Sequence, residues 1–200
     1  MRNALYQQNN YPMVGTRALD VGAGIGRITR QVLVNIFQQV DFQDQNSTFI
    51  SQGLGEMSSL VEAGRVRQGI VHPLQTLTPP NKEYDCIWIQ WVIGYLPKEE
   101  LIATLNRLRP SLRKNGYLII KENCDDELYH DDGDNYLIRK VDDWVNIFNE
   151  SDFQVISHEE DRLLPKTIKP VFFFLLKPKD EFKAEDMRGP LLPKRRRKAL

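Results

Sequence analysis

Three glycines alternate with other residues directly behind an aspartate in the stretch LDVGAGIGR, residues 19–27. An apolar run typical of a strand precedes them and a run with helical spacing follows, so they lie where a strand passes into a helix. Glycine permits a tight turn there and lets a ligand lie against the backbone. Because ligands of open α/β sheets bind at the carboxyl ends of the strands, Gly22, Gly24 and Gly26 predict a site for a nucleotide-like ligand.

An acidic residue at the end of the second strand would complete such a site, because a carboxylate accepts hydrogen bonds from both hydroxyls of a ribose. Asp44 lies 22 residues after Gly22, near the interval of about 20 in dinucleotide-binding folds. Asp41 is the alternative, since a one-residue change of register reverses the face of a strand. Arg27, at the start of the next helix, can hold a carboxylate of the ligand in a bidentate pair.

The elements that must position these residues alternate between strands and helices. Apolar and β-branched runs predict strands over 17–22, 40–45, 65–73, 84–96, 117–123, 154–160 and 171–177. Helical spacing predicts helices over 26–39, 46–64, 98–116 and 142–153. This alternation predicts an α/β fold whose mostly parallel sheet has helices on both faces, with the last two strands pairing antiparallel.

Composition indicates one globular domain. The chain has 200 residues, 41% hydrophobic, and its 27 basic side chains equal its 27 acidic ones, so no overall field favours nucleic acid. Cys86 and Cys124 lack the spacing of a zinc site or a disulfide scaffold. No apolar run has the length of a membrane span or the pattern of a signal peptide, so we expect a soluble intracellular protein.

Three strings of the chain resemble the protein alpha-N-terminal methyltransferases: DVGAGIGRITR (20–30), IWIQWVIGYL (87–96) and KEN (121–123). The late LPKTIKPVFFFLLK is also similar to the closing segment of that family, and the resemblance covers roughly residues 17–176. It implies a Rossmann-like class I fold with S-adenosyl-L-methionine as cofactor and no metal. The implied substrates are proteins with a free X-Pro-Lys or X-Pro-Arg amino terminus.

The resemblance also implies roles for particular residues. The cofactor contacts would come from Gly22, Arg27, Asp44, Gln45, Asn46, Leu74, Gln75 and Gln90. Asn123 would hold the substrate's amino terminus and Asp134 would help to deprotonate it, while Asp131 and Asp132 would meet the basic third residue. Because the spacing from Asn123 is one residue shorter than in the family, Asp132 and Asp134 can exchange roles.

Two side chains complete the implied substrate pocket. Trp91 would supply an aromatic wall suited to a proline ring or a cationic amine, whereas we expect Trp88 to pack in the core. Tyr95 stands where the family usually has histidine; its hydroxyl can orient an amine, but it is a poor base at neutral pH. His130, beside the acidic run 122–135, is the alternative proton acceptor.

The two ends of the chain differ in character from the domain. We expect residues 1–16 to form a short flexible segment without the family's closing lid, 17–177 the methyltransferase domain and 178–200 a flexible tail. The basic run PKRRRK (193–198) favours nuclear targeting over nucleic-acid contact, so the nucleus and cytoplasm are the expected locations. Besides an active enzyme, two alternatives remain: a methyltransferase for another amine, and a non-catalytic binder of X-Pro-Lys amino termini.

Overall fold

The computed structural model describes residues 15–127, 129–131, 133, 135–165 and 167–181. The expectations about the amino-terminal segment, the basic run 193–198, Asp132 and Asp134 fall outside these described residues.

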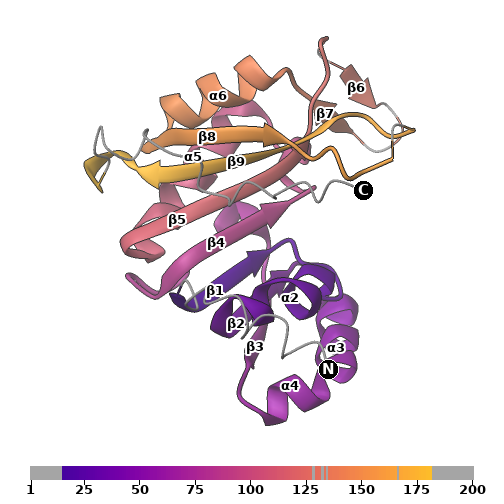
Figure 1. Cartoon of the computed structure of the whole chain (residues 1–200), viewed down its shortest axis with the longest axis vertical. Coiled ribbons are helices and arrows are strands. Elements are labelled where there is room, and N and C mark those ends of the chain that lie inside the picture. Colours follow the sequence, from indigo (N-terminus) through magenta and orange to yellow (C-terminus); the bar gives the residue numbers. More distant parts are fainter. Residues whose placement is uncertain (1–14, 128, 132, 134, 166, 182–200) are drawn as a thin grey trace, which may run out of the picture.

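Seven strands of the described chain form one sheet in the order β3-β2-β1-β4-β5-β9-β8 (Figure 1). Their bounds are β1 Gly15–Val21, β2 Phe37–Asp44, β3 Val66–Val71, β4 Tyr84–Gln90, β5 Leu112–Asn123, β8 Phe153–Glu160 and β9 Val171–Pro178. Strands β1 to β5 pair in parallel, whereas β9 is antiparallel to both β5 and β8. The predicted mostly parallel sheet with an antiparallel strand near the carboxyl terminus is therefore confirmed.

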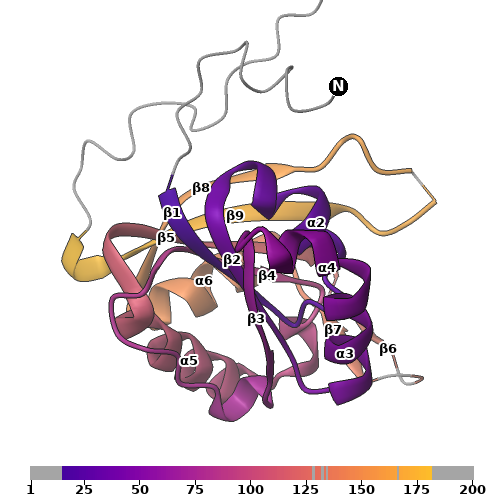
Figure 2. The ribbon, with the colours of Figure 1, turned by 90° about the horizontal axis from the view of Figure 1, so that it is seen from below.

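Helices cover both faces of the sheet (Figure 2). On one face, a buried cluster joins the sheet to Leu101 and Leu105 of α5 (Lys98–Leu108) and to Trp144 and Phe148 of α6 (Val141–Glu150). On the other face, a second cluster includes side chains of α3 (Ser47–Glu56) and of the segments beside α2 (Arg27–Gln31) and α4 (Ser58–Glu62). Burial of apolar side chains on both faces explains why β4, between the two clusters, is almost continuously apolar.

The predicted helix over 26–39 was wrong in its second half. Helix α2 ends at Gln31, a 3₁₀ turn spans Leu33–Asn35, and β2 begins at Phe37. The β-branched Val32, at φ −121°, leaves the helical conformation. Leu33 of this turn is fully buried, and Phe37 pairs with Gly15 of β1, so β2 begins three residues before the strand predicted from residue 40.

Other elements also differ from the predictions: the helix expected over 46–64 is divided at Met57, and the strand expected over 84–96 ends at Gln90. The helix expected over 98–116 ends at Leu108, and a 3₁₀ turn containing Pro110 leads into β5, which begins at Leu112 rather than at 117. The acidic run after β5 contains a small hairpin that periodicity did not predict, β6 (Tyr129–Asp131) paired antiparallel with β7 (Tyr136–Ile138). None of the helices in the described residues has the length and apolar character needed to cross a membrane.

Candidate cofactor and substrate site

The glycine loop lies at the carboxyl end of β1, beside the point where the strand order reverses between β1 and β4. Gly22, Gly24 and Gly26 have φ values of 65°, 58° and 78°, a region that residues with a Cβ seldom adopt. A Cβ at Gly22 would lie 2.8 Å from the Val92 side chain, whereas one at Gly24 would meet no atom within 4 Å. The backbone at Gly24 is thus open to a ligand, as the crevice of this fold requires.

Asp20 lies beneath this loop and is buried. Its Oδ2 accepts a hydrogen bond from Thr29 Oγ1 at 2.7 Å, which ties the end of β1 to α2. Burial raises the pKa of Asp20 to about 7, against the opposing effects of the Thr29 hydrogen bonds and of Arg27. Asp20 therefore positions the loop from below and does not line its open side.

Asp44 connects the glycine loop to the start of α3. Its Oδ2 accepts a hydrogen bond from the Gly24 backbone nitrogen at 2.9 Å, and its Oδ1 accepts one from the Asn46 nitrogen at 2.8 Å. Asn46 in turn caps α3, because its Oδ1 accepts from the nitrogens of Thr48 and Phe49. The carboxylate of Asp44 stands at the pocket, and Asn46 orients the segment that carries it.

Asp41, the alternative for the ribose contact, lies in the core instead. Its side chain is fully buried, and its Oδ2 accepts from Arg67 Nη2 at 2.6 Å and from the Tyr84 hydroxyl at 2.9 Å. Hydrogen bonding to Asp41 contributes to raising the pKa of both Arg67 and Tyr84, although burial is the main cause for Tyr84. Asp41 is thus a structural partner of two side chains, and Asp44 alone of the two faces the pocket.

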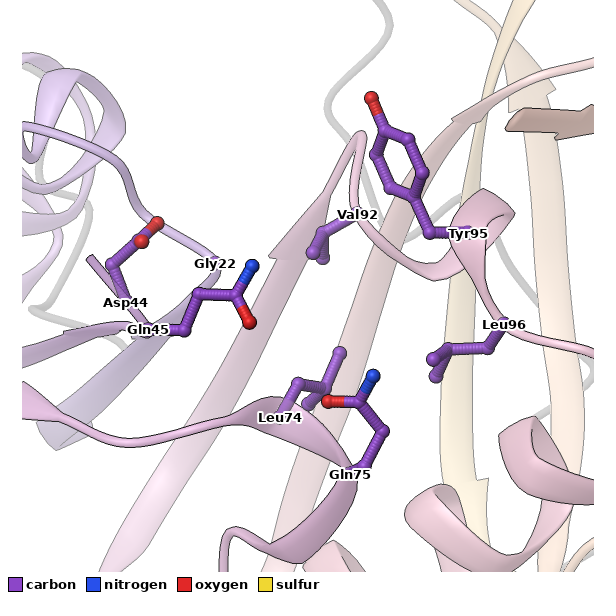
Figure 3. A pocket seen from close by; sticks show the side chains of 8 residues that line it. All are labelled: Gly22, Asp44, Gln45, Leu74, Gln75, Val92, Tyr95 and Leu96. Atoms are coloured by element: carbon purple, nitrogen blue, oxygen red, sulfur yellow. The ribbon is translucent and has the colours of Figure 1, made fainter. Parts of the chain in front are cut away.

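The pocket brings together segments that follow four strands (Figure 3). Its lining residues are Gly22, Asp44, Gln45, Leu74, Gln75, Val92, Tyr95 and Leu96. Six of the eight were predicted from the sequence, whereas Val92 and Leu96 were not. The lining offers apolar walls for a flat base, two amides and one carboxylate, so these residues fit an adenosine with its ribose diol.

The loop after β4 carries Trp91 in a left-handed conformation, at φ 55°. The guanidinium carbon of Arg27 lies 5.8 Å from the ring centroid and Lys121 Nζ lies 5.7 Å from it. The indole Nε1 is buried and has no hydrogen-bond partner among the described residues. A strained backbone and an unpaired buried donor are features that recur at functional sites, so Trp91 stays a predicted substrate contact.

Asn123 and Gln90 are the last residues of the neighbouring strands β5 and β4, so both lie at the carboxyl ends of the parallel strands. Asn123 is half-buried, and its backbone oxygen accepts from Trp144 Nε1 at 3.3 Å. Gln90 Oε1 accepts from Trp88 Nε1 at 3.3 Å, and Trp88 packs in the core as predicted. Asp131, another predicted substrate contact, belongs to β6, which pairs with β7 in a separate two-stranded sheet.

Tyr95 lines the pocket and is about half exposed. Its ring meets that of Tyr136 edge-on, with the centroids 4.9 Å apart.

The buried carboxyl of Glu122, between Lys121 and Asn123, was not among the predicted site residues. The position of Glu122, after the apolar residues 117–120 and directly before the predicted Asn123, was the available signal.

Comparisons with known proteins agree with this geometry. The family model described as AdoMet dependent proline di-methyltransferase matches residues 3–177. The human N-terminal Xaa-Pro-Lys N-methyltransferase 1 is 40% identical over 164 residues, which are 80% of this chain and 71% of that protein. The Caenorhabditis elegans alpha N-terminal protein methyltransferase 1 is 34% identical over 163 residues, 80% of this chain and 68% of that protein.

Solved structures show the same architecture. A SAM-dependent methyltransferase of Leishmania major has a TM-score of 0.77 and 30% identity, covering 88% of this chain and 70% of that one. A Burkholderia thailandensis N1-methyltransferase, solved with bound S-adenosylhomocysteine, has a TM-score of 0.69 at 18% identity, covering 89% and 76%. The latter shares the fold alone.

Proposed function

Because the chain belongs to the family of AdoMet-dependent proline di-methyltransferases, we propose that it methylates the free α-amino group of proteins that begin with Xaa-Pro-Lys or Xaa-Pro-Arg. The observation that carries the proposal is the double use of one loop. Val92, Tyr95 and Leu96 line the pocket, and Trp91, whose ring lies near the Arg27 guanidinium, directly precedes them in the same loop. In this proposal the six residues 91–96 serve both the cofactor and the substrate.

S-adenosylmethionine, when bound, would supply an electrophilic methyl group on a sulfonium, with the thioether S-adenosylhomocysteine as the leaving group when an amine attacks that methyl carbon in line. The chain's contribution is to align the two partners and to present an uncharged amine. Asp44 would hold the ribose, Leu74 and Val92 would enclose the base, and Arg27 would pair with the carboxylate of the methionine portion. None of these roles requires a change of charge on the protein.

The substrate's amine must lose a proton before it reacts, since an α-amino group titrates near pH 7.7–8.0. From the resemblance, Asp134 would accept that proton and Asn123 would orient the terminus. Trp91 would offer its face to the first residue or to the proline ring. A proline in second place has a fixed φ and no amide donor, which suits a narrow channel beside an aromatic ring.

The acidic run after Asn123 predicts a preference at the third residue of the substrate. We expect a peptide that begins Ser-Pro-Glu to react about 100-fold more slowly, in kcat/KM, than one that begins Ser-Pro-Lys, because like charges would meet. Initial rates of S-adenosylhomocysteine release measure this, with Ser-Pro-Gln as the uncharged control. Equal rates for the lysine and glutamate peptides would show that the acidic run does not read this residue.

A further inference from the structure

A buried glutamate joins three segments at the edge of the site. Glu122 precedes Asn123 at the end of β5 and is fully buried. Its Oε1 accepts hydrogen bonds from the backbone nitrogens of Val92 at 2.9 Å and Ile93 at 3.3 Å, and its Oε2 accepts from the Tyr136 hydroxyl. One carboxyl therefore holds the loop after β4 and the hairpin arm β7 against the strand that ends in Asn123.

The Tyr136 side chain of β7 packs against the loop after β4. A Cβ on Gly94 would lie 2.5 Å from the Tyr136 ring, so only glycine permits this approach. The Tyr95 ring packs edge-on against the same ring. Past β7, Arg139 Nη2 donates to the Leu96 backbone oxygen at 2.7 Å, so Tyr136 and Arg139 together contact Gly94, Tyr95 and Leu96.

A carboxyl in this place is costly to keep. Burial raises the pKa of Glu122 to about 7, although the Tyr136 hydroxyl and the backbone donors favour the ionised form. The titratable groups facing it are Tyr136 and Arg139 from the hairpin arm and Cys124 from the end of β5. An apolar side chain would fill the space at lower cost, but it could not accept three donors from two segments.

We propose that Glu122, acting through Tyr136, is the positioning residue that fixes the loop 91–96 and the β6–β7 hairpin relative to Asn123. This inference rests on the proposed function, because these segments carry Trp91, Tyr95 and the acidic run. The ionised carboxylate accepts all three donors. If it is protonated at Oε2, it would instead donate to the Tyr136 oxygen, so the Tyr136 hydroxyl proton would lose its acceptor and the backbone bonds at Oε1 would lose their charge assistance. Protonation would therefore weaken the hold on both segments.

Glu122→Gln and Tyr136→Phe test this, since each alters a hydrogen bond and keeps the side-chain shape. Glutamine imitates the protonated glutamate, so at about pH 8 the variant should have about tenfold lower kcat/KM for a Ser-Pro-Lys peptide. Near pH 6, where wild-type Glu122 is largely protonated, the two should agree within about twofold. The ratio of the two enzymes cancels the titration of the substrate amine. Tyr136→Phe should raise KM for the peptide and, because Val92, Tyr95 and Leu96 line the pocket, should also weaken the binding of S-adenosylhomocysteine.

Hydrogen exchange gives a readout that does not depend on activity. In both variants, segments 91–96 and 129–138 should exchange faster while β2 is unchanged, and Glu100→Gln, an exposed residue of α5, should change neither. Unchanged exchange, or a kcat/KM ratio that is the same at both pH values, would overturn the positioning role. If the wild-type protein methylates no peptide, but the two variants still show the expected faster exchange, the proposed function alone would be refuted.

Discussion

Replacing Asp44 with alanine is expected to weaken the binding of S-adenosylmethionine about 100-fold or more, since hydrogen bonds to a charged group contribute about 1.5–3 kcal/mol each and a ribose offers two. The same change frees the Gly24 nitrogen, which donates to this carboxylate. Calorimetry with S-adenosylmethionine and S-adenosylhomocysteine measures the loss. Asp44→Asn keeps the side-chain shape and one acceptor oxygen, so its affinity for S-adenosylmethionine should lie between those of the wild type and Asp44→Ala.

Asp142→Ala is the matched control, because Asp142 is an exposed acid of α6 that does not line the pocket. It should bind the cofactor as the wild type does. Affinities of Asp44→Ala and wild type within threefold of each other would remove Asp44 from the ribose site.

Replacing Asp41 with alanine should produce the opposite pattern. Removal of one partner from a buried ion pair costs about 3–5 kcal/mol, and we expect about 3 kcal/mol here because the Arg67 side chain is one-third exposed. The buried Tyr84 hydroxyl also loses its acceptor. Urea denaturation should show this loss of unfolding free energy, while the remaining folded protein binds S-adenosylhomocysteine with near-normal affinity.

Tyr84→Phe provides a milder comparison, because it removes one hydroxyl and leaves the Asp41–Arg67 pair in place. It should destabilise the protein by about 1–2 kcal/mol. If Asp41→Ala were as stable as wild type but lost its cofactor, the roles of Asp41 and Asp44 would be reversed.

This contrast shows what the sequence can and cannot predict about the site. The glycine spacing and the interval to Asp44 predicted a pocket at this turn, and the structure has one that Gly22 and Asp44 both line, since both signals are local properties of a strand-to-helix turn. The sequence could not separate Asp41 from Asp44, because the groups that hold Asp41 come from Arg67 and Tyr84, which are distant in the chain. The register between the strands determines that Asp41 is buried and that Asp44 lines the pocket.

The same limit explains the missed elements. The apolar spacing of residues 28–37 suits one long helix or a short helix with a turn, and pairing with β1 selected the second. Strand β6 lies within the acidic run, and β7 follows that run with three residues, too few to show a period. Tyr136 of β7 is held by a contact distant in sequence, its hydrogen bond to Glu122. Val92 and Leu96 entered the pocket through the turn after β4.

The most direct test of the account is to locate the methyl group on the product. A peptide that begins Ala-Pro-Lys, incubated with the protein and S-adenosylmethionine, should carry one or more methyl groups on its α-nitrogen, as fragment-ion mass spectrometry can show. The same peptide with an acetylated amino terminus should not react, because its nitrogen has no free electron pair to offer. Methylation of the lysine side chain, or equal reaction of the free and acetylated peptides, would contradict amino-terminal specificity.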